Sequence, residues 1–273
     1  MVVMERPVER TVLGVPISCF ESQGHAVACV AQTIRKRERT YCVAINPEKV
    51  CYAHGDTTFY DIVRNATFHI CDGSGTAAAV RILWGISIPR ITGIDLFLRL
   101  LTLAEEEKLG VFLLGTRPET IKLARDALLQ MHPQLRCAGC RDGYFRDDES
   151  ASIVEQINAS KADMLFVALG SPKQERWIAK YRSQLEVPFC MGVGGSFDVL
   201  SGQVKRAPKV FRSTGTEWLY RLAREPSRWR RQRVLIGFAL DVLRQRLRPR
   251  LRASEVPCAV RAESEEPSVG RTS

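Results

Sequence analysis

Short apolar runs alternate with amphipathic segments along most of this chain, and this alternation constrains the fold more than any other feature of the sequence. The apolar runs have the length and composition of buried strands, whereas the segments between them repeat apolar residues at helical spacing. Strands that are separated by helices connect through right-handed crossovers, which build a parallel sheet. The sequence therefore predicts an α/β fold, with a Rossmann-like, mostly parallel sheet and helices on both faces.

The individual elements are placed by this periodicity and by the turn residues that bound them. The predicted strands are residues 11–17, 41–45, 67–71, 111–114, 135–138, 163–169 and 187–193. The predicted helices are residues 22–37, 56–65, 76–84, 94–108 and 147–160, with one more that ends at Met131 and another that begins after Pro172. Asn46-Pro47 is expected to form a turn, because the residue before a proline avoids the helical region.

Polar, glycine-containing loops follow several predicted strands. They contain Asn46-Pro47, Asp-Gly-Ser-Gly at 72–75, Gly-Ser-Pro-Lys-Gln-Glu at 170–175 and Gly-Val-Gly-Gly-Ser-Phe-Asp at 192–198. Open α/β sheets bind ligands at the carboxyl ends of their strands, so these loops should converge on one crevice. Glycines allow close approach of the backbone, a helix N-terminus offers N–H groups and Lys173 adds a positive charge, so the crevice suits a phosphate. The dinucleotide fingerprint GxGxxG and the Walker A loop are both missing.

Asp72 is the strongest candidate for acid–base chemistry. It follows an apolar strand and precedes a glycine, which should direct a partly buried carboxylate into the crevice. Burial raises the pKa of a carboxyl group and allows it to act as a general base. The alternative is that Asp72 only caps the helix that begins near Gly75, and both interpretations stay open on the residues alone. Asp95 is better explained as a charge at the N-terminus of a helix than as a catalyst.

The positive charge of the chain is concentrated near its C-terminus. Residues 205–252 contain fifteen basic and three acidic residues, a net charge of +12, whereas the rest of the chain has 25 basic and 27 acidic residues. Arginines at 221, 224, 228 and 231 share one helical face, and Trp218, Leu222, Trp229, Leu235 and Phe238 supply apolar contacts. This pattern is typical of a helix on an anionic bilayer surface. A solvated face, an oligomer contact or a nucleic-acid contact are the alternatives.

These patterns divide the chain into three parts. We expect an α/β catalytic domain at 1–204, a basic helical appendage that associates with a membrane at 205–252 and a disordered tail at 253–273, whose Glu, Ser, Pro and Gly residues cannot build a core. The apolar helix face at 96–103 offers a surface for pairing subunits into a homo-oligomer.

Cysteine usage and hydropathy indicate a cytoplasmic location. The nine cysteines are scattered, and Cys137 and Cys140 form a lone CxxC without a second pair at zinc spacing, so we expect reduced thiols and no metal site. Charged residues near the N-terminus interrupt any secretion signal, and no run approaches the roughly 20 apolar residues of a transmembrane helix. The protein is therefore expected to act at a membrane only from its surface.

Several separated motifs, in order, carry a resemblance to a known family. They are Asn-Pro-Glu at 46–48, Asp-Gly at 72–73, Arg-Ile-Thr-Gly-Ile-Asp at 90–95, Leu-Leu-Gly at 113–115, Gly-Tyr-Phe at 143–145, Ala-Leu-Gly-Ser-Pro-Lys-Gln-Glu at 168–175, Gly-Val-Gly-Gly-Ser-Phe-Asp at 192–198, Ser-Gly-Gln-Val-Lys-Arg-Ala-Pro at 201–208 and Glu-Trp-Leu-Tyr-Arg at 217–221 with Glu-Pro at 225–226. From about residue 12 to residue 233, the chain resembles the WecG/TagA/CpsF glycosyltransferases, glycosyltransferase family 26.

The resemblance implies a reaction and a location. Members of this family move a sugar, often N-acetylmannosamine or its uronic acid, from a UDP-sugar donor to a polyprenyl-diphosphate-linked saccharide, with inversion. The resemblance implies no cofactor and no obligatory metal, and a DxD metal motif is missing here. It places the enzyme peripherally on the inner face of the bacterial cell membrane, in the synthesis of cell-surface polysaccharides.

The resemblance also implies roles for particular residues. Asp72 matches the proposed base, Gln174 a glutamine of the donor site and Asn46 an asparagine of the pocket. The other positions expected at the donor are Gly73, Gly170, Lys173, Glu175, Gly194 and Gly195, and those expected at the lipid diphosphate are Arg221, Arg228 and Arg231. The family often has a threonine where this chain has Ala44, so a hydroxyl contact is lost or is replaced by Thr40 or Ser74.

Two other classes of function remain open on the sequence. One is a Rossmann-type oxidoreductase, which the missing fingerprint disfavours. The other is a nucleic-acid-binding module that uses the basic segment, which would leave the polar loops without a role. The resemblance favours the UDP-sugar, the lipid-linked saccharide and an anionic membrane as partners, and no nucleic acid.

Overall fold

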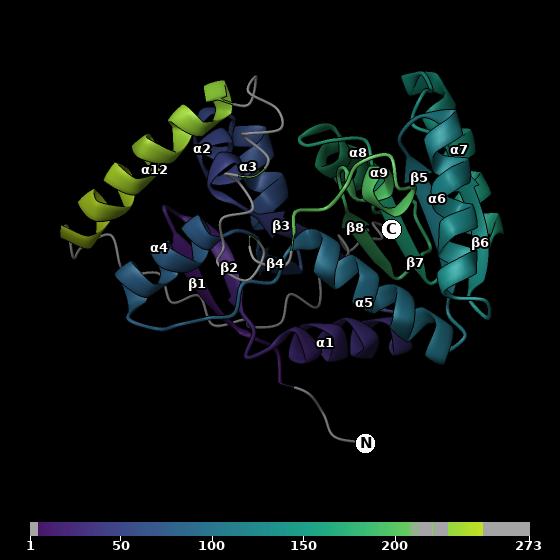
Figure 1. Ribbon diagram of the computed structural model, residues 1–273, viewed down its shortest axis with the longest axis horizontal. Helices are drawn as coiled ribbons and strands as arrows, with labels where there is room; N and C mark the ends of the chain where they lie inside the picture. The colour runs from purple at the N-terminus through teal and green to yellow at the C-terminus, as the bar shows by residue number, and fades with distance from the viewer. Residues whose placement is uncertain (1–4, 209–210, 212–219, 221–228, 248–273) are drawn as a thin grey trace, which may run out of the picture.

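The fold is built on a six-stranded parallel sheet (Figure 1). The computed structural model describes residues 5–208, 211, 220 and 229–247, with the backbone alone described at 229–233. The strand order in the sheet is β4-β3-β8-β7-β5-β6. These strands are β3 (Thr40–Ile45), β4 (Phe68–Cys71), β5 (Gly110–Gly115), β6 (Arg136–Arg141), β7 (Met164–Ala168) and β8 (Phe189–Gly192). The predicted fold class is confirmed.

Helices cover both faces of the sheet. One face carries α1 (Gln23–Arg35), α5 (Gly93–Glu106) and α6 (Pro118–Met131). The other face carries α2 (Pro47–Gly55), α3 (Thr57–Arg64), α7 (Ser150–Ala159) and α8 (Lys173–Tyr181). Successive strand residues alternate between two cores, as Val43 and Ala44 of β3 do. Because both faces are covered, the central strands are continuous apolar runs, which is why the sequence identified them.

The remaining described elements surround this sandwich. They are the strands β1 (Val8–Val12) and β2 (Val15–Cys19), the helices α4 (Ser74–Trp84), α9 (Ser196–Leu200) and α12 (Trp229–Leu247), and a short 3₁₀ turn, η1 (Asp147–Glu149). The predicted helix at 147–160 thus begins as a 3₁₀ turn and continues as α7.

The predicted strand at 11–17 is wrong, because the segment forms a hairpin. Residues 8–12 and 15–19 pair as antiparallel strands around Leu13 and Gly14, whose φ angles are +50° and +80°. Two consecutive positive φ angles are the mark of a tight hairpin turn whose twist matches that of the strands. Leucine is an uncommon residue at such a position, so the apolar pattern concealed the turn.

The predicted end of the strand at Asn46-Pro47 is confirmed, because β3 ends at Ile45 and Asn46 has an extended backbone, but the helix α2 that begins at Pro47 was not predicted. The side chain of Asn46 accepts a hydrogen bond from the amide of Lys49, and Pro47 occupies the first turn of the helix. Proline is favoured there because its missing N–H would have no partner inside the helix. Asparagine followed by proline therefore marked the start of a helix.

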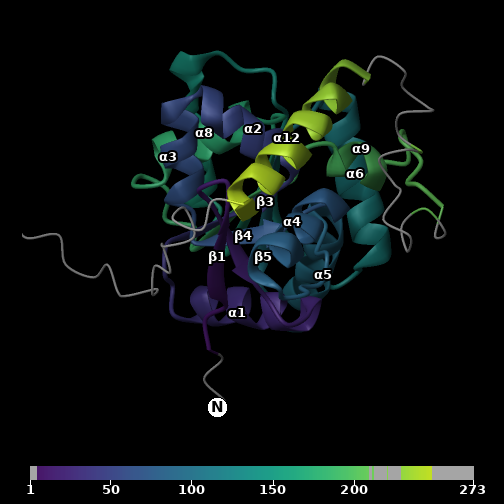
Figure 2. The ribbon, with the colours of Figure 1, turned by 90° about the vertical axis from the view of Figure 1, so that its left-hand side faces the viewer.

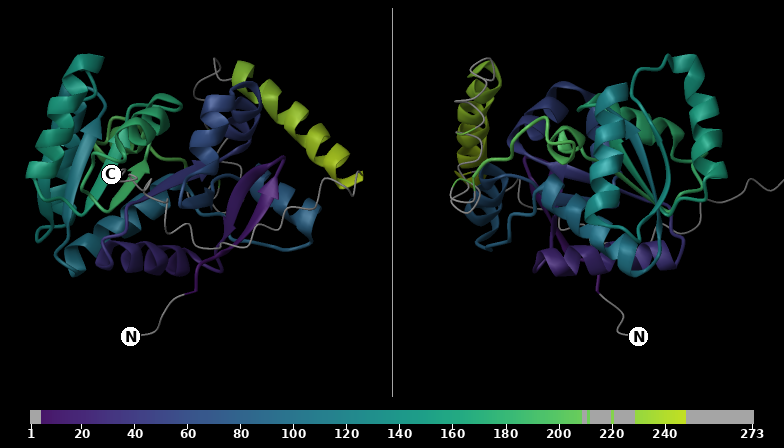
Figure 3. Two further views of the ribbon diagram at one scale, coloured as in Figure 1. Left: turned by 180° about the vertical axis from the view of Figure 1, so that it is seen from behind. Right: turned by 45° about the vertical axis from the view of Figure 1, so that its right-hand side comes forward.

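Helix α12 packs on α4 and α2 (Figure 2). It lies at the opposite end of the molecule from α6 and α7 (Figures 1 and 3). Phe238 and Val242 are buried in this contact, and the side chain of Gln245 accepts a hydrogen bond of 3.0 Å from the amide of Leu13. The expected membrane contact of Phe238 is therefore wrong. The opposite face of α12 exposes a stripe of four apolar side chains, Ile236, Leu240, Leu243 and Leu247.

Two further observations concern surfaces. Leu96, Leu100 and Leu101 of α5 are completely buried in the core, so the proposal that the 96–103 face pairs subunits is wrong. Among the helices that the structure describes, none combines the length and hydropathy needed to cross a bilayer.

Candidate active site

The polar loops singled out in the sequence meet at the carboxyl edge of the sheet. Asp72 follows β4, Asn46 follows β3, residues 193–195 follow β8 and residues 169–172 follow β7. These four strands are neighbours in this order, and all run in parallel. The fold thus assembles one continuous edge from loops that lie far apart in the sequence.

Asp72 lies where the N-terminus of α5 approaches the sheet. Its amide donates a hydrogen bond of 2.9 Å to the carbonyl of Ile45, and its side chain is partly buried. A Cβ atom at Gly93 would lie 3.9 Å from Asp72 Oδ2 and 3.4 Å from the Cβ of Ala44. The N-terminal turn of α5 therefore lies in contact with the carboxylate of Asp72.

The pKa of the neighbouring Cys71 thiol shows which charges lie near Asp72. Burial raises the pKa of Cys71 to about 12, the Asp72 carboxylate adds to the rise and the Arg90 guanidinium opposes it. Residue 91 also joins this corner, since the amide of Ile91 donates to the carbonyl of Cys71 over 3.0 Å. The Arg-Ile-Thr-Gly motif at 90–93 and Asp72 thus belong to one corner of the site.

Gln174 and Glu175 lie in the interior of the site, each with 2% of its surface exposed. Gln174 Oε1 accepts a hydrogen bond of 3.1 Å from the amide of Gly194, and Gln174 Nε2 donates one of 2.9 Å to Glu175 Oε1. Lys49 Nζ lies 2.6 Å from the same oxygen. Burial acts to raise the pKa of Glu175, but the charge and hydrogen bond of Lys49, with the bond from Gln174, hold it below its usual range. Glu175 is therefore a carboxylate.

Three of the four predicted glycines of the site have backbone conformations that favour glycine. Gly73, the N-cap of α4, has a φ of +107°, Gly170 one of +78° and Gly194 one of +52°. Gly195 is the N-cap of α9 and has a negative φ. The amides of Gly194 and Ser196 donate hydrogen bonds to Gln174 Oε1 and to the carbonyl of Val193. In this arrangement neither amide is available to a phosphate.

A cavity of about 920 Å³ opens beside Lys173, at the carboxyl ends of β5, β6 and β7. It is lined by Thr116, Arg117, Gly143, Tyr144, Phe145, Arg146, Glu149, Ala168, Leu169, Lys173, Asp198, Gln203 and Val204. Lys173 Nζ lies 5.7 Å from the centre of the Phe145 ring, and the hydroxyl of Thr116 donates to Asp198 Oδ1 over 3.2 Å. The cavity combines cations with exposed aromatic surface, a combination that suits a nucleotide.

Most residues of this cavity were not among the predicted site residues. Thr116 and Arg117 lie just beyond a recognised motif, and Tyr144 and Asp198 lie inside motifs without having been assigned a role. Tyr144 could have been identified from the sequence, because an aromatic residue after a glycine in a loop is a common ligand contact. In the structure Tyr144 is 69% exposed. What the sequence could not give is that the strands β5, β6 and β7 are neighbours.

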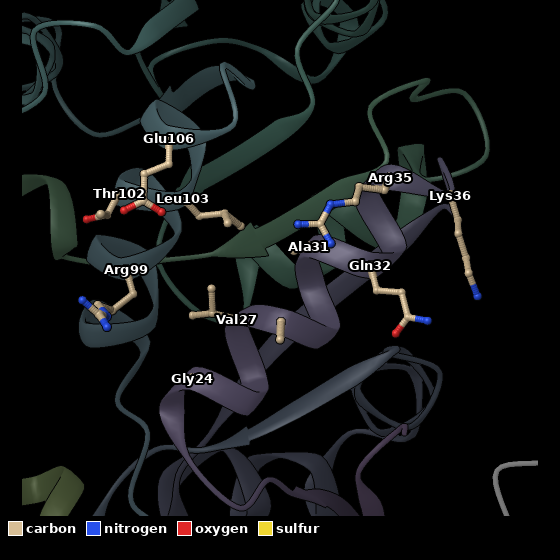
Figure 4. A pocket seen from close by; sticks show the side chains of 11 residues that line it. Gly24, Val27, Ala31, Gln32, Arg35, Lys36, Arg99, Thr102, Leu103 and Glu106 are labelled. Carbon is tan, nitrogen blue, oxygen red and sulfur yellow. The ribbon is translucent and has the colours of Figure 1, made fainter. Parts of the chain in front are cut away.

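A second cavity, of about 310 Å³, lies between α1 and α5 (Figure 4). Its walls include Val27, Gln32 and Arg35 of α1 and Arg99 and Leu103 of α5. None of the predicted site residues lines it, so it is separate from the site at the carboxyl edge.

The structure excludes Thr40 as a replacement for the hydroxyl that is missing at Ala44. The hydroxyl of Thr40 lies at the amino end of β3, where it donates to the carbonyl of Pro188 over 3.2 Å. Thr40 is therefore at the wrong end of the strand to replace a hydroxyl at position 44, whereas Ser74 begins α4 directly beyond Asp72.

The remaining predicted site residues belong to the basic segment. Arg221 and Arg228 lie outside the described residues, and Arg231 lies in α12 at a position whose side chain is outside them. Within the described part of the chain, His, Cys, Asp and Glu side chains do not gather in groups of three or more that could hold a metal ion.

Comparison with known proteins identifies the family of the chain. The family model described as "Glycosyl transferase WecG/TagA/CpsF family" matches residues 10–252. The chain is 37% identical over 201 residues to the N-acetylglucosaminyldiphosphoundecaprenol N-acetyl-beta-D-mannosaminyltransferase of Bacillus subtilis (strain 168), an alignment that covers 74% of this chain and 78% of the relative. The chain therefore belongs to the WecG/TagA/CpsF family and is a glycosyltransferase.

Proposed function

We propose that this enzyme transfers an N-acetylmannosamine-like sugar from a UDP-sugar to a polyprenyl-diphosphate-linked saccharide during synthesis of a bacterial cell-surface polysaccharide. The name of the Bacillus subtilis relative describes transfer of an N-acetyl-β-D-mannosaminyl group to such a lipid-linked sugar. Membership of a glycosyltransferase family decides against an oxidoreductase and leaves a nucleic-acid module without support.

The observation that carries this proposal is the layout of the carboxyl edge. The cavity beside Lys173 lies at the end of β7. Asp72 follows β4, which is three strands away from β7 in the sheet. At the usual spacing of neighbouring strands this is about 14 Å, a span that an extended nucleotide sugar can bridge. The uridine would then occupy the cavity, the diphosphate would meet the loop at 170–173 and the N-terminus of α8, and the sugar would approach Asp72.

The chemistry follows from these places. Asp72 accepts the proton of the acceptor hydroxyl as its oxygen attacks the anomeric carbon, and the bond from that carbon to the UDP oxygen breaks on the opposite face. A single displacement of this kind inverts the anomeric centre. Positioned proton transfer contributes typically about 10²- to 10⁴-fold to rate. Lys173 and the amides of the loop stabilise the charge that develops on the leaving diphosphate.

The acceptor is a membrane lipid, so the enzyme must reach a bilayer surface. The apolar stripe on the outer face of α12 and the basic residues at 205–252 support peripheral attachment to an anionic membrane. Apolar side chains enter the interface while basic residues attract anionic headgroups, at about 1 kcal/mol for each one near the surface. We place the enzyme on the inner face of the bacterial cell membrane.

The test is a product assay. The enzyme is incubated with a short-chain N-acetylglucosaminyl-diphosphate lipid and each of several UDP-hexoses, with UDP-N-acetylmannosamine among them, and the lipid is analysed by mass spectrometry. We expect one added N-acetylhexosamine, and the same yield after addition of EDTA, because the transfer is proposed to need no metal. The proposed function is overturned if no UDP-hexose adds mass to the lipid while the folded enzyme is present.

A further inference from the structure

One buried chain of hydrogen bonds joins three loops of the carboxyl edge. It runs from Lys49 on α2 through Glu175 and Gln174 on α8 to the amide of Gly194 after β8, with distances of 2.6, 2.9 and 3.1 Å. Lys49 and Glu175 are 126 positions apart in the sequence, and their side chains are 11% and 2% exposed. The chain therefore connects the β3, β7 and β8 loops through groups that are largely withdrawn from solvent.

The chain also fixes which way the amide of Gln174 points. The amide of Gly194 can only donate, so it requires the oxygen of Gln174, and the nitrogen of Gln174 must then face an acceptor. A carboxylate such as Glu175 is an acceptor at both oxygens, and Lys49 compensates its buried charge. Loss of either partner would leave an uncompensated charge in a largely buried site.

Gly192 closes the space around the same amide. A Cβ atom at this position would lie 2.5 Å from Gln174 Nε2 and 2.9 Å from its Cδ. The amide of Gln174 thus lies directly against the backbone at the end of β8. A side chain at position 192 would have to displace it.

We propose that Lys49 and Glu175 are positioning residues, which hold the amide of Gln174, and with it the 170–173 loop that receives the donor diphosphate, against the backbone at the end of β8. This inference rests on the proposed function. Lys49 and Glu175 do not themselves contact the donor in this scheme, although Glu175 was expected at the donor on the sequence alone. Their contribution is made through Gln174 and Gly194.

The kinetic test compares Glu175→Met, Lys49→Met and Glu175→Gln with the wild-type enzyme. Both methionine variants should lower kcat about ten- to hundredfold with a smaller change in the KM for the donor, because small misplacements of a site cost about that much. Glu175→Gln keeps an oxygen that can accept from Lys49 and Gln174, so it should retain more turnover than Glu175→Met. The matched control is the exposed pair Lys161–Glu186, whose side chains are 75% and 56% exposed. Lys161→Met and Glu186→Gln should leave kcat and KM unchanged.

A second readout does not depend on turnover. In protein labelled with ¹⁵N-glutamine, the side-chain amide of Gln174, identified by its loss in Gln174→Glu, should be shifted and exchange faster in Glu175→Met and Lys49→Met. It should be unchanged in Lys161→Met. Should wild-type enzyme fail to use any UDP-sugar, the proposed function fails, and the amide signal still decides whether the pair positions Gln174.

A third variant covers the case in which removal of a buried charge prevents folding. Gly192→Ala displaces the amide of Gln174 and leaves both charged residues in place, so it should also lower kcat. The inference is overturned if folded Glu175→Met, Lys49→Met or Gly192→Ala keeps wild-type kcat and an unshifted Gln174 amide.

Discussion

Arg206 lies 111 positions after Asp95 in the sequence, yet its Nη2 lies 2.5 Å from Asp95 Oδ1. The hydroxyl of Thr92 donates to the other carboxylate oxygen, also over 2.5 Å. Asp95 is therefore a charge in the first turn of α5, as the sequence indicated, and it also ties the motif at 201–208 to that turn. Gly93 of the same turn adjoins Asp72, so the ion pair braces the helix that covers the proposed base.

Arg206→Met should loosen this bracing. The pair is partly exposed, with side chains 16% and 36% accessible, so we expect a loss of about 1 kcal/mol in the free energy of unfolding, together with reduced turnover. Urea denaturation measures the first effect. Arg125→Met, which removes an exposed partner of Asp126, is the control and should change the stability by less than about 0.5 kcal/mol. Equal stability losses in the two variants would contradict the bracing role.

Asp72→Asn should retain donor binding and lose turnover by at least about tenfold, because the amide cannot accept the proton of the acceptor hydroxyl. Donor binding is measured by titration calorimetry and turnover by the product assay. The N-cap of α4 is Gly73 and not Asp72, so the substitution leaves the cap in place, and an unchanged thermal midpoint would show that the lost turnover is not a loss of folding. An unchanged kcat would remove Asp72 from the mechanism.

The Lys49–Glu175 pair should leave a signature in the pH dependence of stability. The pKa of Glu175 is lowered in the folded protein, so its stabilising contribution is fully present above the usual glutamate pKa of about 4.3 and is lost as the pH falls through the folded value. Relative to Glu175→Gln, the wild type should therefore have a constant stability difference above about pH 5.5 and a shrinking one below about pH 4.3. Urea denaturation across this range measures it. A difference that grows on acidification would indicate a raised pKa instead.

The outer stripe of α12 should control attachment to membranes. Leu240→Glu with Leu243→Glu should lower binding to anionic liposomes at least about tenfold, because each leucine contributes about 1.5–3 kcal/mol when it leaves water. Both side chains are 49% exposed, so the fold should be preserved. Leu123→Glu with Leu129→Glu on α6 is the matched control, at exposures of 48% and 37%. Liposome flotation measures both, and equal losses would contradict a specific role for α12.

Much of the fold could be predicted because local sequence patterns, such as apolar runs and helix caps, specify it. The buried strands β3 and β7 are unbroken apolar runs, and Ser22, Asp56 and Thr92 cap helices with their own side chains. The failures were local too. Leu13 occupies a hairpin turn although it is apolar, and its amide donates a hydrogen bond to the distant Gln245. Pro47 occupies the first turn of α2, a helix that the turn signal concealed.

By itself, the sequence determined most of the strands and helices, that the sheet is mostly parallel and which loops lie at its carboxyl edge, because side-chain periodicity and capping act over a few residues. Only the tertiary structure decided that Glu175 is buried against Lys49, that the amide of Gly194 is held by Gln174 and that Phe238 faces the protein. Such pairings join residues that are distant in the chain, and burial of a charge depends on every element packed around it. The spacing of residues in the sequence reveals neither these pairings nor the burial.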